Sequence, residues 1–180
     1  MGRIKICLFK GKVLGVDILI FVTLGTQDKP FPRLLEAIQK QLDSGNIRKD
    51  EKIIVQSGCT KFKSSDMQIK QYMDIKEFEK NIEDADIVIC HAGVGTILAA
   101  LKNNKKIIAA ARLKKYGEHV NDHQLQILEN FSNEGHLLAL DDFEKLDEKL
   151  REVKGFNPNP FKSNNQLFVE TLEKEIEMYS

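Results

Sequence analysis

The fold is decided by the stretch Asp86-Ile-Val-Ile-Cys-His-Ala-Gly-Val-Gly-Thr96, which continues into Ile97-Leu-Ala-Ala-Leu101. A run of apolar, mostly β-branched residues ends at a histidine, two glycines follow, and the apolar spacing then becomes helical. This order is typical of a buried strand, a tight turn and a helix. Gly93 and Gly95 let the backbone approach a ligand closely, and the free N–H groups at the start of a helix bind phosphate. The stretch predicts either a phosphate site or a turn whose glycines serve packing alone.

The same alternation of strand and helix extends on both sides of this unit. We expect strands at 18–24, 52–56, 67–72, 86–90, 106–110 and 136–140, and helices at 31–42, 75–82, 96–103, 120–131, 142–152 (capped by Asp141) and 164–178. This pattern indicates one α/β domain with a mainly parallel sheet, spanning residues 18–163. Residues 1–17 form an arm of uncertain structure. The helix within 164–180 either docks a partner or covers the sheet.

The composition is that of a soluble globular domain. Of 180 residues, 42% are hydrophobic and 30% charged, and the 27 basic residues balance the 27 acidic ones. A net charge of zero argues against a nucleic-acid partner, which needs a basic surface. Three cysteines without a C-x-x-C spacing predict neither a disulfide framework nor a zinc site, so a cytoplasmic location is expected. The longest apolar run, 18–24, is far shorter than the ~20 residues of a membrane-spanning helix.

Two further polar loops are expected beside the glycine turn. Gly25-Thr26-Gln27 ends the first strand, and the stretch Tyr116-Gly-Glu-His-Val-Asn-Asp-His-Gln124 precedes a helix. The carboxyl ends of parallel strands meet at one edge of a sheet, so these loops are expected to face one ligand crevice. Convergent polar groups in such a crevice are suited to the hydroxyls of a sugar.

The histidines of these loops admit several interpretations. His119 and His123 are four residues apart, so on a helix they would share a face and could hold a metal with Asp122. The alternative is a plain helix start, with Asn121 or Asp122 as the cap. His91 could sit over a phosphate, act as a base, or be a satisfied histidine at a strand end. The chain lacks a Walker lysine and a nucleophile elbow, which excludes P-loop kinases and α/β-hydrolases.

In combination, these segments resemble a known family. The segments are Phe21-Val-Thr-Leu-Gly-Thr-Gln27, Gln56-Ser-Gly58, 82–96, His119-Val-Asn-Asp-His-Gln124 and Glu134-Gly-His136. They resemble the carboxy-terminal domain of glycosyltransferase family 28, and within it the β-1,4-galactosyltransferase subunits of bacterial capsule and exopolysaccharide synthesis. They are also similar to the catalytic subunit of the eukaryotic two-part UDP-N-acetylglucosamine transferase that acts on dolichol diphosphate. The resemblance runs from about Ile18 to the last helix.

The resemblance implies a Rossmann-like domain that forms the donor-binding half of a GT-B glycosyltransferase. A separate, membrane-anchored subunit would bind the acceptor, a lipid-linked saccharide, and would recruit this chain to the cytoplasmic face of the membrane. The expected reaction is an inverting transfer of a hexose, galactose above all, from a UDP-sugar. No metal or other cofactor is expected, because backbone N–H groups and a helix dipole can stabilise a diphosphate leaving group.

The resemblance also assigns roles to residues. Donor binding falls to three groups, which are Gly25, Thr26 and Gln27; Gly93, Val94, Gly95 and Thr96; and Asn121, Asp122, His123 and Gln124. Catalytic roles fall to His91 and His119, beside the reacting centre. Many family members place a ribose-binding glutamate at the position of Ala99, where this chain has none, so backbone or another side chain would hold the ribose.

Two rival functions remain. Ala99 favours a regulatory or scaffolding subunit that has lost donor binding. An unrelated nucleotide-binding enzyme such as an epimerase is disfavoured, because no acidic residue ends a second strand at the spacing of a dinucleotide site.

Overall fold

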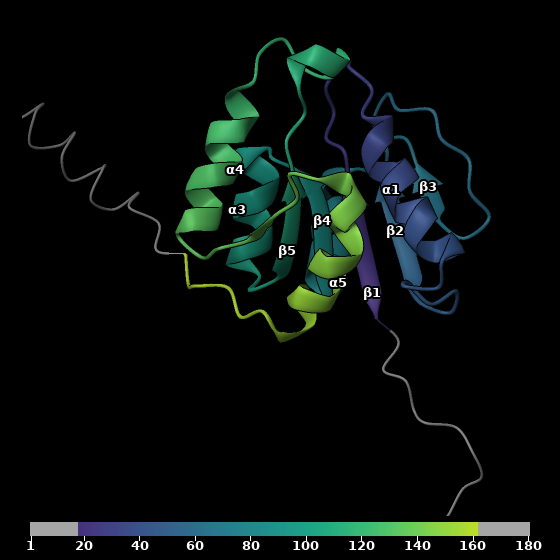
Figure 1. Cartoon of the computed structure of the whole chain (residues 1–180). Coiled ribbons are helices and arrows are strands. Elements are labelled where there is room, and N and C mark those ends of the chain that lie inside the picture. Colours follow the sequence, from purple (N-terminus) through teal and green to yellow (C-terminus); the bar gives the residue numbers. More distant parts are fainter. Residues whose placement is uncertain (1–17, 162–180) are drawn as a thin grey trace, which may run out of the picture.

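The structure, a computed structural model, describes residues 18–161. The arm expected at 1–17 and the helix expected at 164–178 lie outside these residues. The described part is an α/β domain built on one sheet, with helices on both of its faces (Figure 1).

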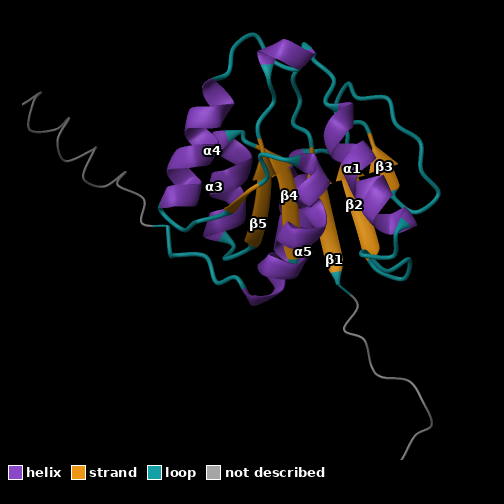
Figure 2. Cartoon of the chain, in the orientation of Figure 1, coloured by secondary structure: helices purple, strands orange, loops and turns teal. Residues whose placement is uncertain are grey.

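Six parallel strands form the sheet in the order β3-β2-β1-β4-β5-β6. Their bounds are β1 (Leu19–Thr23), β2 (Lys52–Gln56), β3 (Gln68–Lys70), β4 (Ile87–His91), β5 (Lys106–Ala110) and β6 (Leu138–Ala139). β1 and β4 are neighbours, and the chain moves outward from them in opposite directions. Such a topological switch point is where open α/β sheets bind ligands, outside the carboxyl ends of the strands. In Figure 2 the strands run upward, and the loops that follow them lie at the top.

Five α-helices cover the described sheet in two layers. α1 (Pro32–Asp43) and α5 (Leu146–Gly155) cover one face, and α2 (Ile75–Asp84), α3 (Val94–Lys102) and α4 (His123–Asn133) cover the other. The period of two along β1 explains this arrangement, because successive side chains of a strand point to opposite faces. Ile20 and Val22 join the core under α1 and α5, whereas the fully buried Phe21 joins the core under α2, α3 and α4. The predicted α/β fold with a parallel sheet is thus confirmed.

Three expected helix starts are wrong. α3 begins at Val94 rather than Thr96, because Gly93 occupies the N-cap position. α4 begins at His123 rather than at 120, because the Asp122 carboxylate accepts a hydrogen bond from the Lys114 N–H group (2.8 Å) and holds the preceding residues in a loop. The helix expected at 142–152 starts as the 3-10 turn η2 (Phe143–Lys145), whose cap is Asp142 and not Asp141.

The edge strands β3 and β6 are shorter than expected, since each pairs on one side alone. Within residues 18–161, no helix has the length and apolar character needed to cross a membrane.

Candidate nucleotide site

A cavity of about 500 Å³ lies at the switch point between β1 and β4. Its wall comes from the turns after β1 and β4, from the last residues of β2 and β4, from Met73 and from helices α2 and α3. The residues lining it are Gly25, Thr26, Gln27, Gln56, Met73, Ile75, Phe78, Glu79, His91, Gly93, Gly95, Thr96 and Ala99. The two glycine turns that the sequence predicted to face one crevice therefore line one cavity. Met73, Ile75 and Phe78 add an apolar stretch to its lining.

The turns after β1 and β2 press against each other at the rim of this cavity. Gly25 and Gly58 both have positive φ angles (+79° and +59°), a conformation that side chains other than glycine rarely adopt. A Cβ atom on Gly58 would collide with the carbonyl oxygen of Gly25. Both glycines are therefore required by the backbone, and they fix the position of Thr26 at the mouth of the cavity.

His91, the last residue of β4, lies between Gly25 and Gly93. A Cβ atom on Gly25 would lie 2.7 Å from the Cε1 and Nε2 atoms of the imidazole, and one on Gly93 would collide with Nε2. Gly93 thus makes room for the histidine ring, so at this glycine the packing role that the sequence left open applies. The ring is held by packing on both sides, and its Nδ1 atom is buried without a hydrogen-bond partner among residues 18–161.

Burial keeps the His91 imidazole neutral. It lowers the pKa of His91 to about 4, and the nearby positive charge of Arg112 is the second cause. The backbone of Thr23 opposes this shift, and a smaller contribution from His119 adds to it. A general base works best with a pKa near the working pH. His91 is therefore suited to positioning and hydrogen bonding, and it is a poor base at neutral pH.

The lowered pKa of His91 predicts a pH-dependent stability. The unfolded chain binds a proton near pH 6.5 and the folded chain near pH 4, so above pH 6.5 neither state is protonated and the stability is complete. As the pH falls through this window, protonation of the unfolded state lowers the free energy of unfolding by about 2 kcal/mol between pH 7 and pH 5. Urea unfolding at the two pH values measures this loss. The His91→Gln variant should not show this loss of stability, and the control His123→Gln, at an exposed site, should show it in full. Equal losses in the unmodified chain and both variants would refute the prediction.

The N-terminus of α3 supplies donors to the cavity. Gly93 is the N-cap and offers no side-chain cap, so the N–H groups of Val94, Gly95 and Thr96 have no acceptor within the described chain. A Cβ atom on Gly95 would meet nothing within 4 Å. The first turn of α3 therefore presents free donors and the positive end of a helix dipole to open space, which is the usual arrangement for binding a phosphate.

Arg112, which was not predicted from the sequence, places a buried guanidinium next to the cavity. Arg112 follows β5 and is 1% exposed. Its Nη2 atom donates to the carbonyl oxygen of Leu24, and its Nη1 atom donates to the side-chain oxygen of Gln27 (3.3 Å). Burial lowers the pKa of Arg112, yet a guanidinium remains protonated in proteins. A single arginine directly after an apolar strand is the signal that could have revealed it.

The residues expected to hold a donor sugar lie on the same edge of the sheet but outside the cavity wall. Gln124 is buried, and its side-chain oxygen accepts the N–H group of Arg112 (3.0 Å). Asp122 binds the Lys114 N–H group, as described above, and the His123 ring contacts Gln126 (3.1 Å). Asn121 accepts the backbone N–H group of His123 (3.2 Å). In the free chain these side chains thus stabilise their own loop, and a sugar-binding role for them stays a prediction.

Of the two interpretations of His119 and His123, the structure shows the plain helix start with Asp122 at the cap position, and the two histidines do not share a helix face. His119 lies in the loop before α4, where its Nδ1 atom contacts the carbonyl oxygen of Asn121 (3.0 Å). Among the described residues, no group of three or more His, Cys, Asp or Glu side chains is placed to hold a metal ion.

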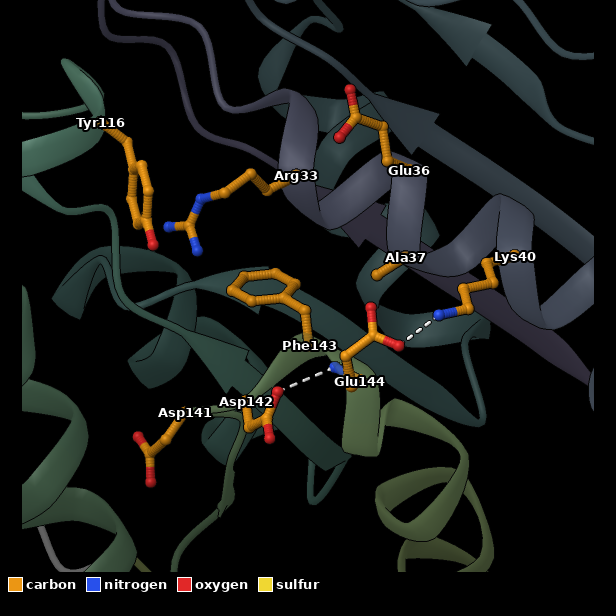
Figure 3. Close-up of a pocket in the computed structure, with 9 residues that line it drawn as sticks. All are labelled: Arg33, Glu36, Ala37, Lys40, Tyr116, Asp141, Asp142, Phe143 and Glu144. Carbon is orange, nitrogen blue, oxygen red and sulfur yellow. Dashed lines mark hydrogen bonds and ion pairs between the residues drawn. The ribbon is translucent and has the colours of Figure 1, made fainter.

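A second cavity, of about 430 Å³, lies between α1, η1 (Lys114–Tyr116) and η2, and Figure 3 shows its wall. Four of its nine residues carry carboxylates, namely Glu36, Asp141, Asp142 and Glu144. Its two cations are already paired, Lys40 with Glu144 and Arg33 with Glu118. A phosphate would meet net negative charge here and free N–H groups at the switch point. Of these two cavities, electrostatics therefore favour the one at the switch point for an anionic ligand.

Comparison with known proteins decides the family. The glycosyltransferase family 28 C-terminal domain matches residues 19–177. The chain belongs to this family. It is 35% identical over 75 residues to the UDP-N-acetylglucosamine transferase subunit ALG13 of Candida albicans, covering 42% of this chain and 24% of that protein. The subunit of the same name from Candida glabrata is 46% identical over 54 residues, covering 30% and 25%. Each alignment thus spans about a quarter of the relative.

Solved structures share this fold. The glycotransferase of kitacinnamycin superposes with a TM-score of 0.61 at 16% identity, over 86% of this chain and 39% of that chain. The solution structure of ALG13 superposes with a TM-score of 0.54 at 20% identity, over 87% and 94%. At these identities the likeness concerns the fold, which is that of a GT-B glycosyltransferase domain.

Proposed function

We propose that the chain is the donor-binding subunit of a two-component glycosyltransferase and that it binds a UDP-sugar in the switch-point cavity. The observation that carries this proposal is the cavity itself, whose lining combines the free N–H groups at the start of α3 with the apolar side chains of Met73, Ile75 and Phe78. A nucleoside diphosphate has the matching polarity, with an apolar base at one end and an anionic diphosphate at the other. Family membership and the name of the Candida relatives support the same ligand.

In this proposal the diphosphate lies on the first turn of α3. The N–H groups of Val94, Gly95 and Thr96 donate to its oxygens, Thr26 lies beside it, and the base packs on Met73, Ile75 and Phe78. When the bond between the sugar carbon and the phosphate oxygen breaks, negative charge develops on the diphosphate, and preorganised donors stabilise that charge without a metal or other cofactor. An acceptor hydroxyl attacks the opposite face of the sugar carbon, which inverts its configuration.

The base that takes the proton of the acceptor hydroxyl belongs, in this proposal, to a partner. His91, with a pKa of about 4, is unsuited to that task at neutral pH, and His119 is held within its own loop. A membrane-anchored acceptor-binding subunit would supply the base, bind the lipid-linked saccharide and hold this chain at the cytoplasmic side of the membrane. Capsule or exopolysaccharide synthesis is the setting that the sequence resemblance suggests.

Calorimetry with UDP, UDP-galactose and UDP-N-acetylglucosamine tests this function on the full chain, alone and with its copurified partner. The sequence resemblance predicts the galactose donor, whereas the Candida relatives are named for N-acetylglucosamine transfer. Tighter binding of one sugar nucleotide than of UDP itself would identify the donor. Absence of binding by every UDP compound, with and without the partner, would refute the function. Activity of the complex that survives loss of UDP binding to this chain would favour the scaffolding alternative, which Ala99 and the missing base support.

Arg112 provides a further prediction about this site. Its buried charge lies next to the turn that carries Thr26 and Gln27. Within the described chain, no carboxylate lies within hydrogen-bond distance of the Arg112 guanidinium. Arg112→Met should weaken UDP binding about tenfold, because an attractive charge is lost from a low-dielectric region. The free energy of unfolding should change by only about 1 kcal/mol, since the lost bond to Leu24 is offset by the removal of a buried charge. Calorimetry and urea unfolding measure the two effects. The exposed Arg151→Met is the control, and unchanged UDP affinity in Arg112→Met would contradict the prediction.

A further inference from the structure

One carboxylate, that of Glu79, lines the switch-point cavity within the described chain. The remainder of the wall consists of glycine backbone, hydroxyl and amide side chains, apolar groups and the neutral His91 ring. A negative charge is unfavourable beside a diphosphate unless it binds another part of the ligand. The position of Glu79 indicates which part that is.

Glu79 lies on α2, in a helix whose orientation is fixed by packing. Ile82, three residues later, is fully buried. Phe78 packs edge-on against Phe21 of β1, with ring centroids 5.5 Å apart. Asp74 caps the helix by accepting the Glu77 N–H group (2.8 Å). Glu79 is one turn after Ile75, so both line the same cavity from the same side of α2.

The Glu79 carboxylate is available to a ligand. It forms no hydrogen bond or ion pair with any residue in 18–161, whereas its neighbour Glu77 is paired with Lys70. On α3, which packs against α2, the residue that lines the cavity one turn after Thr96 is Ala99. A methyl group accepts no hydrogen bond, so this stretch of the wall has one strong acceptor, and α2 supplies it.

The order of groups in a nucleoside diphosphate places the ribose at this stretch. With the diphosphate on the first turn of α3 and the base on Met73, Ile75 and Phe78, the ribose lies between them, beside Ala99 and Glu79. A carboxylate has two acceptor oxygens and binds two adjacent hydroxyls at once, with charge-assisted bonds. Acidic side chains hold ribose hydroxyls in the same way in dinucleotide-binding domains.

We propose that Glu79 binds the ribose 2′- and 3′-hydroxyls and makes the site selective for ribonucleotides over 2′-deoxyribonucleotides. This inference rests on the proposed binding of UDP. It gives a function to the one carboxylate that lines the cavity within the described chain.

Calorimetry with UDP and 2′-deoxy-UDP tests the inference. The unmodified full chain should bind UDP about 10- to 100-fold tighter than 2′-deoxy-UDP, the loss expected for one hydrogen bond to a charged group. Glu79→Gln should reduce this ratio to threefold or less. Removing a negative charge beside the diphosphate raises the affinity for both ligands equally, because both carry the same diphosphate. This effect therefore cancels in the ratio of the two affinities. Glu83→Gln, an exposed change one turn later on the same helix and outside the cavity, should keep the full ratio.

A rescue variant separates hydrogen bonding from damage to the helix. Adding Ala99→Glu to Glu79→Gln should restore the preference for UDP, because the carboxylate then faces the same ribose from α3. An unchanged ratio in Glu79→Gln, or a uniform loss of affinity for both ligands, would overturn the inference and leave the proposed function intact. Failure of the unmodified chain to bind UDP at all would instead refute the proposed function.

Discussion

Gly95→Glu is expected to lower the affinity for UDP roughly 100-fold or more while leaving the thermal unfolding temperature unchanged or slightly raised. A Cβ atom at this position meets open space, so the fold tolerates the new side chain. The same open space is where the diphosphate would lie. Glutamate there fills it, opposes the charge of the ligand and removes at least two charge-assisted hydrogen bonds, each contributing about 1.5–3 kcal/mol.

The unchanged stability is as important as the lost binding. Glutamate has a better helix propensity than glycine, and a negative charge in the first turn of a helix is favourable. Gly155→Glu is the matched control, because Gly155 also has open space at its Cβ position but lies at the end of α5. That control should bind UDP like the unmodified chain and lose a few tenths of a kcal/mol of stability. Full UDP affinity in Gly95→Glu would mean that the diphosphate does not lie on α3.

Arg33→Met is expected to lower the free energy of unfolding by about 3 kcal/mol. The guanidinium of Arg33 forms two hydrogen bonds of 2.6 Å to the carboxylate of Glu118, whose side chain is 2% exposed. Arg33 also stacks between Tyr116 and Phe143, with its central carbon 4.0 and 4.5 Å from the ring centroids (Figure 3). Removing the cation leaves a buried carboxylate without its partner. Arg33 is partly exposed, so the low end of the usual cost applies.

A double-mutant cycle distinguishes a paired charge from simple loss of packing. Glu118→Gln keeps an acceptor for the N–H group of Leu113 (3.0 Å) and should cost less than Arg33→Met. The double variant should be more stable than the sum of the two changes predicts, because no buried charge is then left unpaired. Lys40→Met, on the same helix, removes an exposed ion pair with Glu144 and should change stability by less than about 1 kcal/mol. Additive losses in the cycle would contradict the assigned role of the pair.

The fold was predictable because its signals are local and repeated. β2 and β5 agree with their expected bounds, since each is a short apolar run bounded by turn or polar residues. The glycine turns were predictable for the same reason, because strand, turn and helix follow one another within the stretch 86–101. α4 was misplaced because its start depends on the bond between Asp122 and Lys114, which closes a loop of eight residues. Apolar spacing contains no information about such a contact.

The site was predictable only in part, since several of its members are brought together by the tertiary structure. Arg112 and Arg33 contact residues 85 to 88 positions away in the chain. Glu79 lies in the helix that was expected at 75–82, and the sequence of that helix gives no indication of a ligand. The sequence left a ligand role and a packing role open for Gly93, and the His91 ring that reaches back over the turn decides for packing. Such contacts need the folded chain, which places α2 and α3 on the same wall.

Amide chemical-shift mapping on titration with UDP locates the ligand on the folded chain. If the diphosphate lies on the first turn of α3, the largest changes occur at the amides of Thr26, Gln27, Val94, Gly95 and Thr96, with little change at 141–144 in the acidic cavity. Largest changes at 141–144, or no changes when UDP is in excess and the partner is present, would contradict this position of the diphosphate.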